Sequence, residues 1–254
     1  MQKKKIATLG LAFVILVSVG LYFVFFRLNK KSSAENQNIK TAQTETISIE
    51  DEKITDNTAP FKIDITYPKI AGQEEFNTLV KNIVDKQISD FKTNSLENDT
   101  AVKETDPVTY AKYPREYDLI ISYDKGEVDT NLASVVLNIY YFEGGAHGMT
   151  IQTAVNYDFK NKKEIVLADI YAGQENYVQK ISDYCITDLT KQITEAMGSD
   201  SAQYMDKNAI ELGAGPTAEN FNIFLINKEN ITFYFPQYQV AAGYLGGFKV
   251  VMPR

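Results

Sequence analysis

An uncharged, mostly apolar run of 21 residues, from Ile6 to Phe26, lies near the start of this 254-residue chain. At about 1.5 Å per residue, a helix of that length measures roughly 31 Å, which matches the hydrocarbon core of a bilayer. A cleaved signal peptide has a shorter apolar region, of roughly 7–15 residues, with a small-residue cleavage site close behind it. We therefore predict that residues 1–31 are a short cytoplasmic tail and an uncleaved, single-pass transmembrane anchor. Basic residues flank this run on both sides: Lys3, Lys4, Lys5, Arg27, Lys30 and Lys31.

The chain beyond the predicted anchor is acidic. All 33 Asp and Glu residues follow residue 31, with 20 of the 26 Lys and Arg residues, so residues 32–254 carry a net charge of −13. Such a body is repelled by nucleic acid and by anionic surfaces, and it attracts cationic partners. Nucleic acid is therefore not an expected partner, although acidity also serves solubility alone. Cys185 is the only cysteine, so an apolar core rather than disulfides must hold the exported body.

Residues 32–58 are polar and contain no aromatic residue, which is typical of a flexible tether. The alternation of apolar and polar residues from Thr46 to Ile54 is compatible with one short strand inside this tether. From residue 59 onward the chain has the mixed texture of a folded domain. We therefore expect a tether over residues 32–58 and an extracytoplasmic domain over residues 59–254.

Hydrophobic periodicity predicts the elements of this domain. Apolar residues at helical spacing predict two long amphipathic helices, over Gln73–Leu96 and Gly173–Met197. Alternation and β-branched residues predict strands over Phe61–Tyr67, Tyr117–Tyr123, Asn131–Phe142, Met149–Phe159 and residues 222–226, 231–235 and 246–252.

The segments between these elements complete the expected fold. Pro68 is expected to end the first strand, residues 98–114 to form an irregular connection, and Asp124–Gly126 to begin a turn. This order of elements predicts an α+β fold with an antiparallel sheet meander and two long amphipathic helices. We expect one domain, or two intimate subdomains over residues 59–145 and 146–254.

The stretch YYFEGGAHGMT, Tyr140–Thr150, contains the only histidine of the chain. Its glycines supply the backbone freedom that a hairpin turn needs, so it is predicted to hold the loop between two long strands. A bond between a histidine ring nitrogen and a loop carbonyl would explain this residue without catalysis. Because loops held by rigid strands often carry binding, we select this loop as the candidate binding site. Its candidate residues are Glu143, Gly144, Gly145, His147 and Gly148.

The sequence lacks most of the residue patterns that well-known catalytic sites require. A catalytic triad would have to use His147, and no Gly-x-Ser-x-Gly elbow is present. Cys185 falls on the apolar side of its predicted helix, where a buried, inert thiol is expected. Glu143 and His147 could join Asp158 or Asp169 in a carboxylate-rich metal site, but no spacing here is diagnostic of a metal. We therefore assign no catalytic residue, no metal site and no cofactor.

Several motifs from residue 58 onward occur in an order found in one known family. They are Ile65-Thr-Tyr-Pro68, Tyr140-Tyr-Phe-Glu-Gly-Gly-Ala-His147, Asn156-Tyr-Asp158, Leu167-x-Asp169, Phe221-x-x-Phe224, Phe233-x-Phe-x-x-Tyr238 and the Gly246 to Pro253 ending. On these motifs, about three quarters of the chain resembles the extracytoplasmic domain of unknown function of RsiV-type anti-sigma factors. The same domain precedes the catalytic domain of PdaC-type peptidoglycan deacetylases.

The resemblance implies a partner and also excludes some roles. In RsiV-type proteins this domain binds lysozyme, a strongly cationic enzyme, and an acidic body suits such a partner. Only Met1–Lys5 precede the predicted anchor, so the anti-sigma role is not expected. The related deacetylases use a zinc site with two histidines and an aspartate, which a chain with one histidine does not provide. We therefore do not expect the deacetylase catalytic domain here.

These observations predict a non-enzymatic, membrane-tethered, extracytoplasmic domain with a binding or sensor-like role. Its partner would be a cationic protein such as lysozyme, or a cell-wall glycan, while its N-terminal helix would sit in the lipid bilayer. Two alternatives stay open. One is a cell-envelope hydrolase that uses His147 and nearby carboxylates, and the other is a purely structural component of the envelope.

Overall fold

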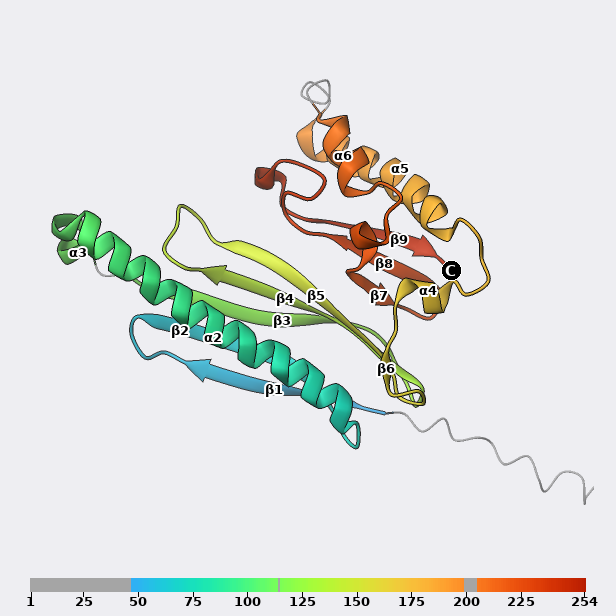
Figure 1. Ribbon diagram of the computed structural model, residues 1–254, viewed down its shortest axis with the longest axis horizontal. Helices are drawn as coiled ribbons and strands as arrows, with labels where there is room; N and C mark the ends of the chain where they lie inside the picture. Colours follow the sequence, from blue (N-terminus) through green and yellow to red (C-terminus); the bar gives the residue numbers. More distant parts are fainter. Residues whose placement is uncertain (1–46, 114, 199–204) are drawn as a thin grey trace, which may run out of the picture. The chain divides into compact units, whose positions relative to one another are not determined.

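Two β-sheets with their covering helices make up the described part of the protein in the computed structural model (Figure 1), which describes residues 47–113, 115–198 and 205–254. The predicted transmembrane anchor, residues 1–31, and the first part of the predicted tether lie outside the described residues. Among the described helices, none is long and apolar enough to cross a membrane. The described residues pack as one compact unit.

The first sheet has six strands in the order β1-β2-β3-β4-β5-β6. Its strands are β1 (Ile49–Asp56), β2 (Phe61–Ile70), β3 (Tyr117–Val128), β4 (Leu132–Phe142), β5 (Met149–Asp158) and β6 (Lys163–Glu164). Neighbouring strands are antiparallel, except that β2 and β3 are parallel. The exception arises because α2 (Glu74–Thr105) carries the chain back along the sheet between them, so that β3 begins at the same end as β2. The predicted antiparallel meander is therefore found from β3 to β5 and is wrong at β2–β3.

Helix α2 covers one face of this sheet (Figure 1). Its residues Phe76, Val80, Val84 and Phe91 are buried at helical spacing, which confirms the predicted amphipathic stripe. Apolar burial of this kind contributes about 25 cal/mol per Å², so this layer is a main source of stability. The stripe packs against residues that alternate along β2–β5, namely Ile63, Ile65, Leu119, Ile121, Val135, Leu137, Ile139 and Val155.

The second sheet has three antiparallel strands in the order β7-β8-β9. Helix α5 (Tyr177–Met197) packs on it and buries Ile181, Cys185, Leu189 and Ile193, as the sequence predicts. The strands of this sheet are β7 (Phe224–Ile226), β8 (Asn230–Phe235) and β9 (Phe248–Pro253). The shorter helices of the protein are α3 (Pro107–Lys112), α4 (Leu167–Ile170), α6 (Lys207–Gly213), η2 (Ala218–Phe221) and η3 (Gly243–Leu245).

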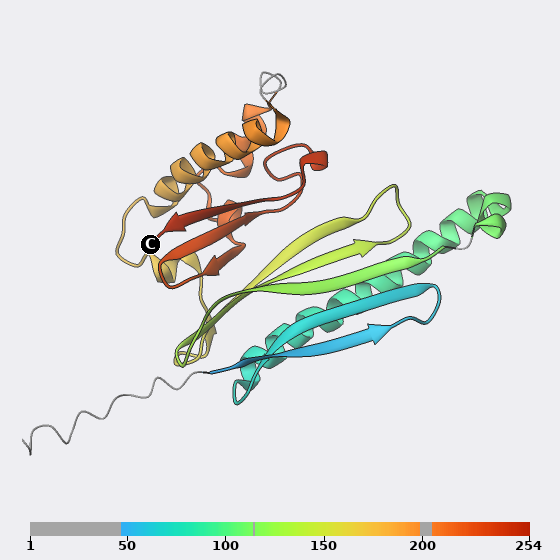
Figure 2. The same ribbon diagram turned by 180° about the vertical axis from the view of Figure 1, so that it is seen from behind.

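The second sheet lies on the face of the first sheet that α2 leaves open (Figure 2), and a buried polar bridge joins the two sheets. The Ser134 hydroxyl of β4 accepts a hydrogen bond from the Ile226 N–H of β7 at 2.7 Å and donates one to Asn156 Oδ1 of β5. Asn156 Nδ2 in turn donates to Phe224 O at 3.0 Å. Ser134 and Asn156 are 0 % and 4 % exposed, so each of these bonds is shielded from water.

A second bridge between the sheets is partly charged. Tyr234 OH of β8 donates to Asp124 Oδ2 of β3 at 2.7 Å, and Lys249 Nζ of β9 donates to the same oxygen at 2.6 Å. The Lys249 ammonium also lies 4.6 Å from the centre of the Tyr234 ring, within cation–π range. Apolar packing of Val136 against Leu225 and Tyr234 fills the space between the two bridges.

Strand β1 corrects the predicted tether. Residues 49–56 pair with β2 along their full length, so the fold begins before residue 59. The alternation from Thr46 to Ile54 indicates a short strand here, but its charged residues, which natural edge strands often carry, hide that it belongs to the sheet. Only Ile49 and Ile54 of this strand pack against the core.

Pro68 lies inside β2 instead of ending it. Ile70 directs its N–H and C=O to the Asn77 side chain at 2.8 Å, away from β1. Pro68, two residues earlier, therefore directs its nitrogen to the same side. Pairing with β3 has already ended at Ile65, so no strand on that side requires a donor from residue 68.

Two predicted connections are regular structure. Residues 98–105 continue α2 and residues 107–112 form α3, although the buried stripe of α2 has ended by then, at Ser95. Gly126 lies within β3, and a side chain there would place its Cβ 2.3 Å from Ile226 O. This glycine is thus required by the close approach of β7, and the turn follows at Asp129, which accepts bonds from Asn131 N and Leu132 N.

The predicted subdomain boundary between residues 145 and 146 falls inside a hairpin. Tyr141 pairs with Met149 across that hairpin, so both strands belong to the same sheet. The first sheet ends only with β6, and the layer of α5 and the second sheet follows from α4 onward. The hydrophobic pattern could not place this boundary because both strands of the hairpin are equally apolar.

Candidate functional site

The β4–β5 loop, residues 143–148, lies at the end of two long paired strands and is held by side chains of α2 and of the segment just before β3. Asn98 Nδ2 donates to Glu143 O at 3.1 Å, and Asn94 Nδ2 donates to Glu143 Oε1 at 3.2 Å. Arg115 Nη1 donates to Gly144 O at 3.4 Å. The start of the candidate loop is thus fixed by side chains that come from elsewhere in the chain.

Two of the three loop glycines are required by close contacts. Gly144 has a φ of +87°, and a Cβ there would lie 2.9 Å from the Tyr117 ring. At Gly148 a Cβ would lie 2.3 Å from the Tyr140 hydroxyl. Gly145 has open space around it and is exposed. The loop therefore has a tightly packed base and an exposed tip.

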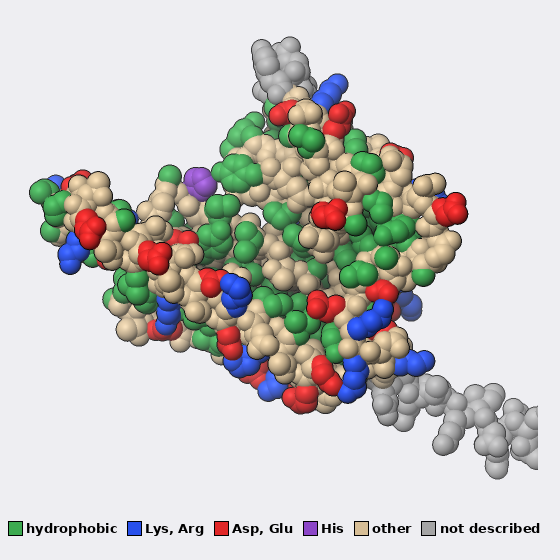
Figure 3. Space-filling model, in the orientation of Figure 1, with side chains coloured by type: hydrophobic (Ala, Val, Ile, Leu, Met, Phe, Trp, Pro, Cys, Tyr) green, Lys and Arg blue, Asp and Glu red, His purple; other side chains and the backbone are tan. Residues whose placement is uncertain are grey.

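His147 is exposed and stands out on the molecular surface (Figure 3). Its Nδ1 lies 3.0 Å from Gly148 O, the type of bond to a loop carbonyl that the sequence analysis considers. Because a carbonyl only accepts, Nδ1 carries the proton and Nε2 accepts from Tyr238 OH at 3.4 Å. The imidazole therefore joins its own loop to a residue 91 positions later in the chain.

Tyr238 is the part of this site that the sequence analysis does not select. Its side chain is 53 % exposed, and its backbone has a φ of 73°, in the left-handed region. That conformation costs a residue other than glycine about 1–3 kcal/mol, and such strain is concentrated at functional sites. The ring lies on Gly243, where a Cβ would be 2.2 Å from it. Its only sequence signal is its place at the end of the Phe233-x-Phe-x-x-Tyr238 motif.

Asp158 and Asp169, the other members of the metal site considered above, do not reach His147. Asp158 ends β5 while the loop precedes its first residue, and ten residues of strand span about 30 Å. Backbone N–H groups of Asn161 and Lys160 lower the pKa of Asp158. Asp169 pairs with Lys163 at 2.6 Å, which lowers its pKa as well. Within residues 47–113, 115–198 and 205–254, no group of three or more His, Cys, Asp or Glu side chains is placed to hold a metal ion.

Cys185 lies on the buried face of α5, and burial raises the pKa of its thiol to about 12. A thiol needs its thiolate form to act as a nucleophile, and this one stays protonated at neutral pH. The sulfur thus behaves as part of the apolar core, as the sequence analysis expects.

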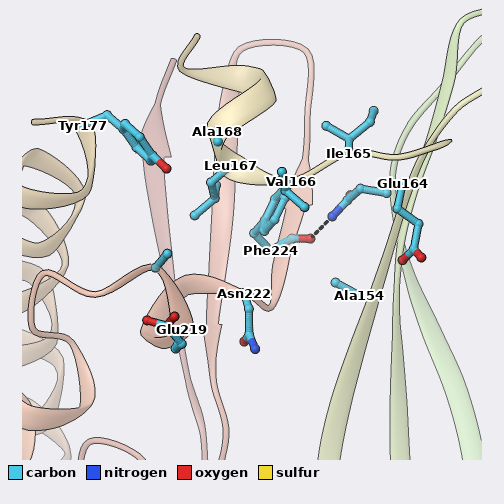
Figure 4. Close-up of a pocket in the computed structure, with 12 residues that line it drawn as sticks. Ala154, Glu164, Ile165, Val166, Leu167, Ala168, Tyr177, Glu219, Asn222 and Phe224 are labelled. Carbon is cyan, nitrogen blue, oxygen red and sulfur yellow. Dashed lines mark hydrogen bonds between the residues drawn. The ribbon is translucent and has the colours of Figure 1, made fainter. Parts of the chain in front are cut away.

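A cavity of about 360 Å³ opens between the two sheets (Figure 4), and its lining includes no residue of the β4–β5 loop. One wall is the segment of residues 164–168 that links β6 to α4, and the other is formed by η2, β7 and the first residue of α5. The hydrogen bond from Asn156 to Phe224 O joins two of the lining residues (Figure 4). The sequence analysis does not detect this cavity, because residues distant in the chain form it.

Two family models match this chain, and the boundary between the two matched segments lies close to the boundary between the two layers of the fold. Residues 54–150 match the family model described as "Deacetylase PdaC", and residues 168–254 match the model described as "Protein of unknown function (DUF3298)". A curated relative, the peptidoglycan-N-acetylmuramic acid deacetylase PdaC of Bacillus subtilis (strain 168), is 26 % identical over 254 residues. The match covers 100 % of this chain but only 50 % of that protein.

Solved structures show the same fold. A DUF3298-family protein from Bacteroides fragilis aligns with 83 % of this chain and 91 % of its own at a TM-score of 0.51 and 16 % identity. A DUF3298-family protein from Pseudomonas aeruginosa PAO1 aligns with 83 % of this chain and 92 % of its own at a TM-score of 0.50 and 14 % identity. The chain thus contains a segment that matches the PdaC model and carries the β4–β5 loop, followed by a segment that matches the DUF3298 model and carries Tyr238.

Proposed function

We propose that this PdaC/DUF3298-type domain is a non-enzymatic binding module of the cell envelope, and that its partner is a cationic protein of the lysozyme class. The binding surface consists of the β4–β5 loop, residues 143–148, together with Tyr238. One observation carries the proposal, namely that an exposed loop is fixed at its base and meets a strained, exposed tyrosine at its tip.

Pre-organisation is the physical reason to assign binding to this surface. A segment already held in place loses little conformational entropy when a partner docks on it, so more of its contact energy appears as affinity. The backbone of Glu143 and the ring of His147 are both held by hydrogen bonds from outside the loop. Tyrosine is enriched at interfaces because its ring offers a large contact area and its hydroxyl one polar bond.

Charge supports a cationic protein over other partners. The net charge of −13 on residues 32–254 attracts cations and repels anionic polymers. Electrostatic attraction of this kind raises the association rate and is screened by salt, with a Debye length of about 10 Å at 0.1 M and 3 Å at 1 M. Binding should therefore weaken markedly as the salt concentration rises.

The hydrolase alternative receives less support from the same side chains. His147 uses one ring nitrogen within its own loop and the other on Tyr238, so neither bond is to a carboxylate. The thiol of Cys185 is buried and protonated. The relative's name describes a protein twice the length of this match, and its activity is a property of that whole protein.

Membrane attachment is a further part of the proposal. The apolar run Ile6–Phe26 would hold the acidic domain at the outer side of the cell membrane, with part of residues 32–48 as the spacer. Fractionation of cells that express the full-length chain should recover it with membranes, and external protease should degrade the domain in spheroplasts. Recovery in the cytosol would contradict this part of the proposal.

A pull-down tests the partner class. The full-length chain is mixed with resin-bound cationic lysozyme at low salt and at about 0.5 M salt, and it should be retained only, or mainly, at low salt. Tyr238→Ala should weaken retention by about tenfold, which corresponds to roughly 1.4 kcal/mol. Tyr113→Ala is the matched control, because Tyr113 follows α3, is 57 % exposed and is not part of the proposed surface.

Other outcomes distinguish the alternatives. Absence of retention at both salt concentrations would contradict the cationic-protein proposal, and co-sedimentation with purified peptidoglycan instead would assign the domain to glycan binding. Release of soluble product from peptidoglycan that is lost in His147→Ala would favour the hydrolase.

A further inference from the structure

The cavity between the sheets has the size and position of a ligand site. Its volume of about 360 Å³ falls within the range of roughly 300–1,000 Å³ that is typical of small-ligand pockets. It lies beside the polar bridge of Ser134 and Asn156, so its walls are held by the contact between the two sheets. Its wall of residues 164–168 joins the two layers of the protein.

Most of the lining is aliphatic or aromatic. The apolar side chains that line the cavity are Ala154, Ile165, Val166, Leu167, Ala168, Ala218, Tyr177 and Phe224. Asn156 also lines it, but its amide oxygen and its amide nitrogen each already make a hydrogen bond in the bridge between the sheets. An occupant must therefore present mainly hydrocarbon to these walls.

The available charge in the lining is negative. Glu164 and Glu219 are exposed lining residues that lie at different walls of the cavity (Figure 4). The described residues that line the cavity include no Lys, Arg or His, and no salt bridge among the described residues involves either glutamate. Two carboxylates without a neighbouring cation disfavour an anionic ligand and favour a cationic one.

An alkylammonium group fits this combination better than a sugar does. A hexose carries hydroxyl groups around its whole rim, and each one that is buried without a partner costs free energy. The polar groups offered by the lining are few, namely Glu164, Glu219, Asn222 and the Tyr177 hydroxyl. A lysine side chain instead presents a four-carbon apolar stem that ends in one compact, strongly hydrated charge.

We propose that the cavity receives a lysine side chain of a polypeptide partner. The stem lies along Ile165, Val166 and Leu167, and the ammonium group lies at the carboxylate of Glu164, while Glu219 at the other wall adds to the negative charge of the cavity. This inference rests on the proposed function, because a cationic protein partner is the source of the lysine. It adds a second contact area, separate from the β4–β5 loop and Tyr238.

A small probe tests the cavity without the partner. N-acetyl-lysine methylamide is titrated into the full-length chain while methyl NMR signals are followed. The methyl signals of Ala154, Val166, Leu167, Ala168 and Ala218 should shift with a dissociation constant in the millimolar range. The methyl groups of Leu212, 70 % exposed and outside the lining, should not shift.

Matched ligands and variants identify the cause of the shifts. N-acetyl-norleucine methylamide has an apolar stem without the ammonium group and should bind about tenfold more weakly or not at all. Glu164→Gln should weaken the lysine probe by about two- to fivefold, as expected for a partly exposed ion pair, and Glu219→Gln should weaken it less. Glu195→Gln, an exposed substitution elsewhere on α5, should leave binding unchanged.

Three results would overturn the inference: no shift of the cavity methyls at high probe concentration, equal binding of the norleucine probe, or shifts caused by N-acetylglucosamine but not by the lysine probe. Its failure is distinguishable from failure of the proposed function. Lysozyme retention without a probe response would contradict the lysine site in the cavity and leave the proposed lysozyme-class partner standing. A probe response without lysozyme retention would contradict the proposed partner and leave the lysine site standing.

Discussion

Single residues hold the two sheets together. Asn156 and Ser134 are buried polar side chains, and each satisfies one backbone group of β7. A buried donor or acceptor that loses its partner costs about 1–3 kcal/mol, which is more than a surface bond contributes. The Asn156-Tyr-Asp158 motif therefore has a physical role in joining the layers.

Replacement of Asn156 tests this role. Asn156→Ala should lower the free energy of unfolding by about 2 kcal/mol, because Phe224 O and Ser134 Oγ lose a buried partner. Urea unfolding followed by circular dichroism measures the change. Asn222→Ala, at an exposed position, should change it by less than about 0.5 kcal/mol. Equal effects of the two substitutions would show that the bridge does not stabilise the fold.

The charged bridge at Asp124 makes stability depend on pH. Burial raises the pKa of this carboxyl, but hydrogen bonds from Lys249 and Tyr234 outweigh it, so the net shift is downward. A carboxyl with a lowered pKa in the folded state stabilises the protein above its unfolded pKa of about 3.9. That contribution is lost as the pH falls through the lower, folded-state pKa.

Asp124→Asn should therefore have an effect that depends on pH. At pH 7 we expect it to lower the free energy of unfolding by about 1 kcal/mol, at the low end for a charged hydrogen bond because the side chain is 35 % exposed. The difference between the two proteins should shrink as the pH falls from about 4 toward 2. Thermal unfolding at several pH values measures it, and a difference that stays constant with pH would contradict the assignment.

At the residue scale, the sequence predicts the loop with His147 but not the other part of the candidate site, Tyr238. His147 draws attention as the single histidine, and the glycines around it predict a loop. Tyr238 cannot be found in the same way, because its contact with His147 joins residues 91 positions apart. That contact depends on how the two sheets dock, and docking in turn depends on buried polar residues that periodicity does not detect.

At the scale of elements, amphipathic stripes predict the long helices well. Both α5 and the first part of α2 present one apolar face, and both were predictable for that reason. The end of α2 has no such face. There Asp99 accepts hydrogen bonds from Tyr110 OH and Tyr117 OH, each at 2.6 Å, and these bonds fasten the last turns of α2 to α3 and β3.

Asp99→Ala should release this end of the helix. Amide hydrogens of residues 99–112 should exchange faster, while those of residues 76–91 keep their protection because the buried stripe is intact. Hydrogen exchange with mass spectrometry resolves the two segments. Asp85→Ala, in a pair with Lys81 at 2.6 Å on the exposed side of α2, is the control. Unchanged exchange at residues 99–112 would show that Asp99 is not needed there.

At the scale of the whole molecule, the proposed binding surface exists only when both layers are docked. The β4–β5 loop belongs to the PdaC segment, and Tyr238 belongs to the DUF3298 segment. Each layer could be outlined from periodicity, but their contact could not, because it rests on Ser134, Asn156 and Asp124. The edge strand β1 was predicted only as a short strand within a tether, because most of its residues are charged.

The most direct test of the proposed binding module is hydrogen exchange of the full-length chain with and without cationic lysozyme at low salt. The account predicts added protection at residues 143–148 and around Tyr238, with residues 107–113 unchanged, and loss of this protection in Tyr238→Ala. Added protection confined to other segments, or none while lysozyme is in excess, would contradict it.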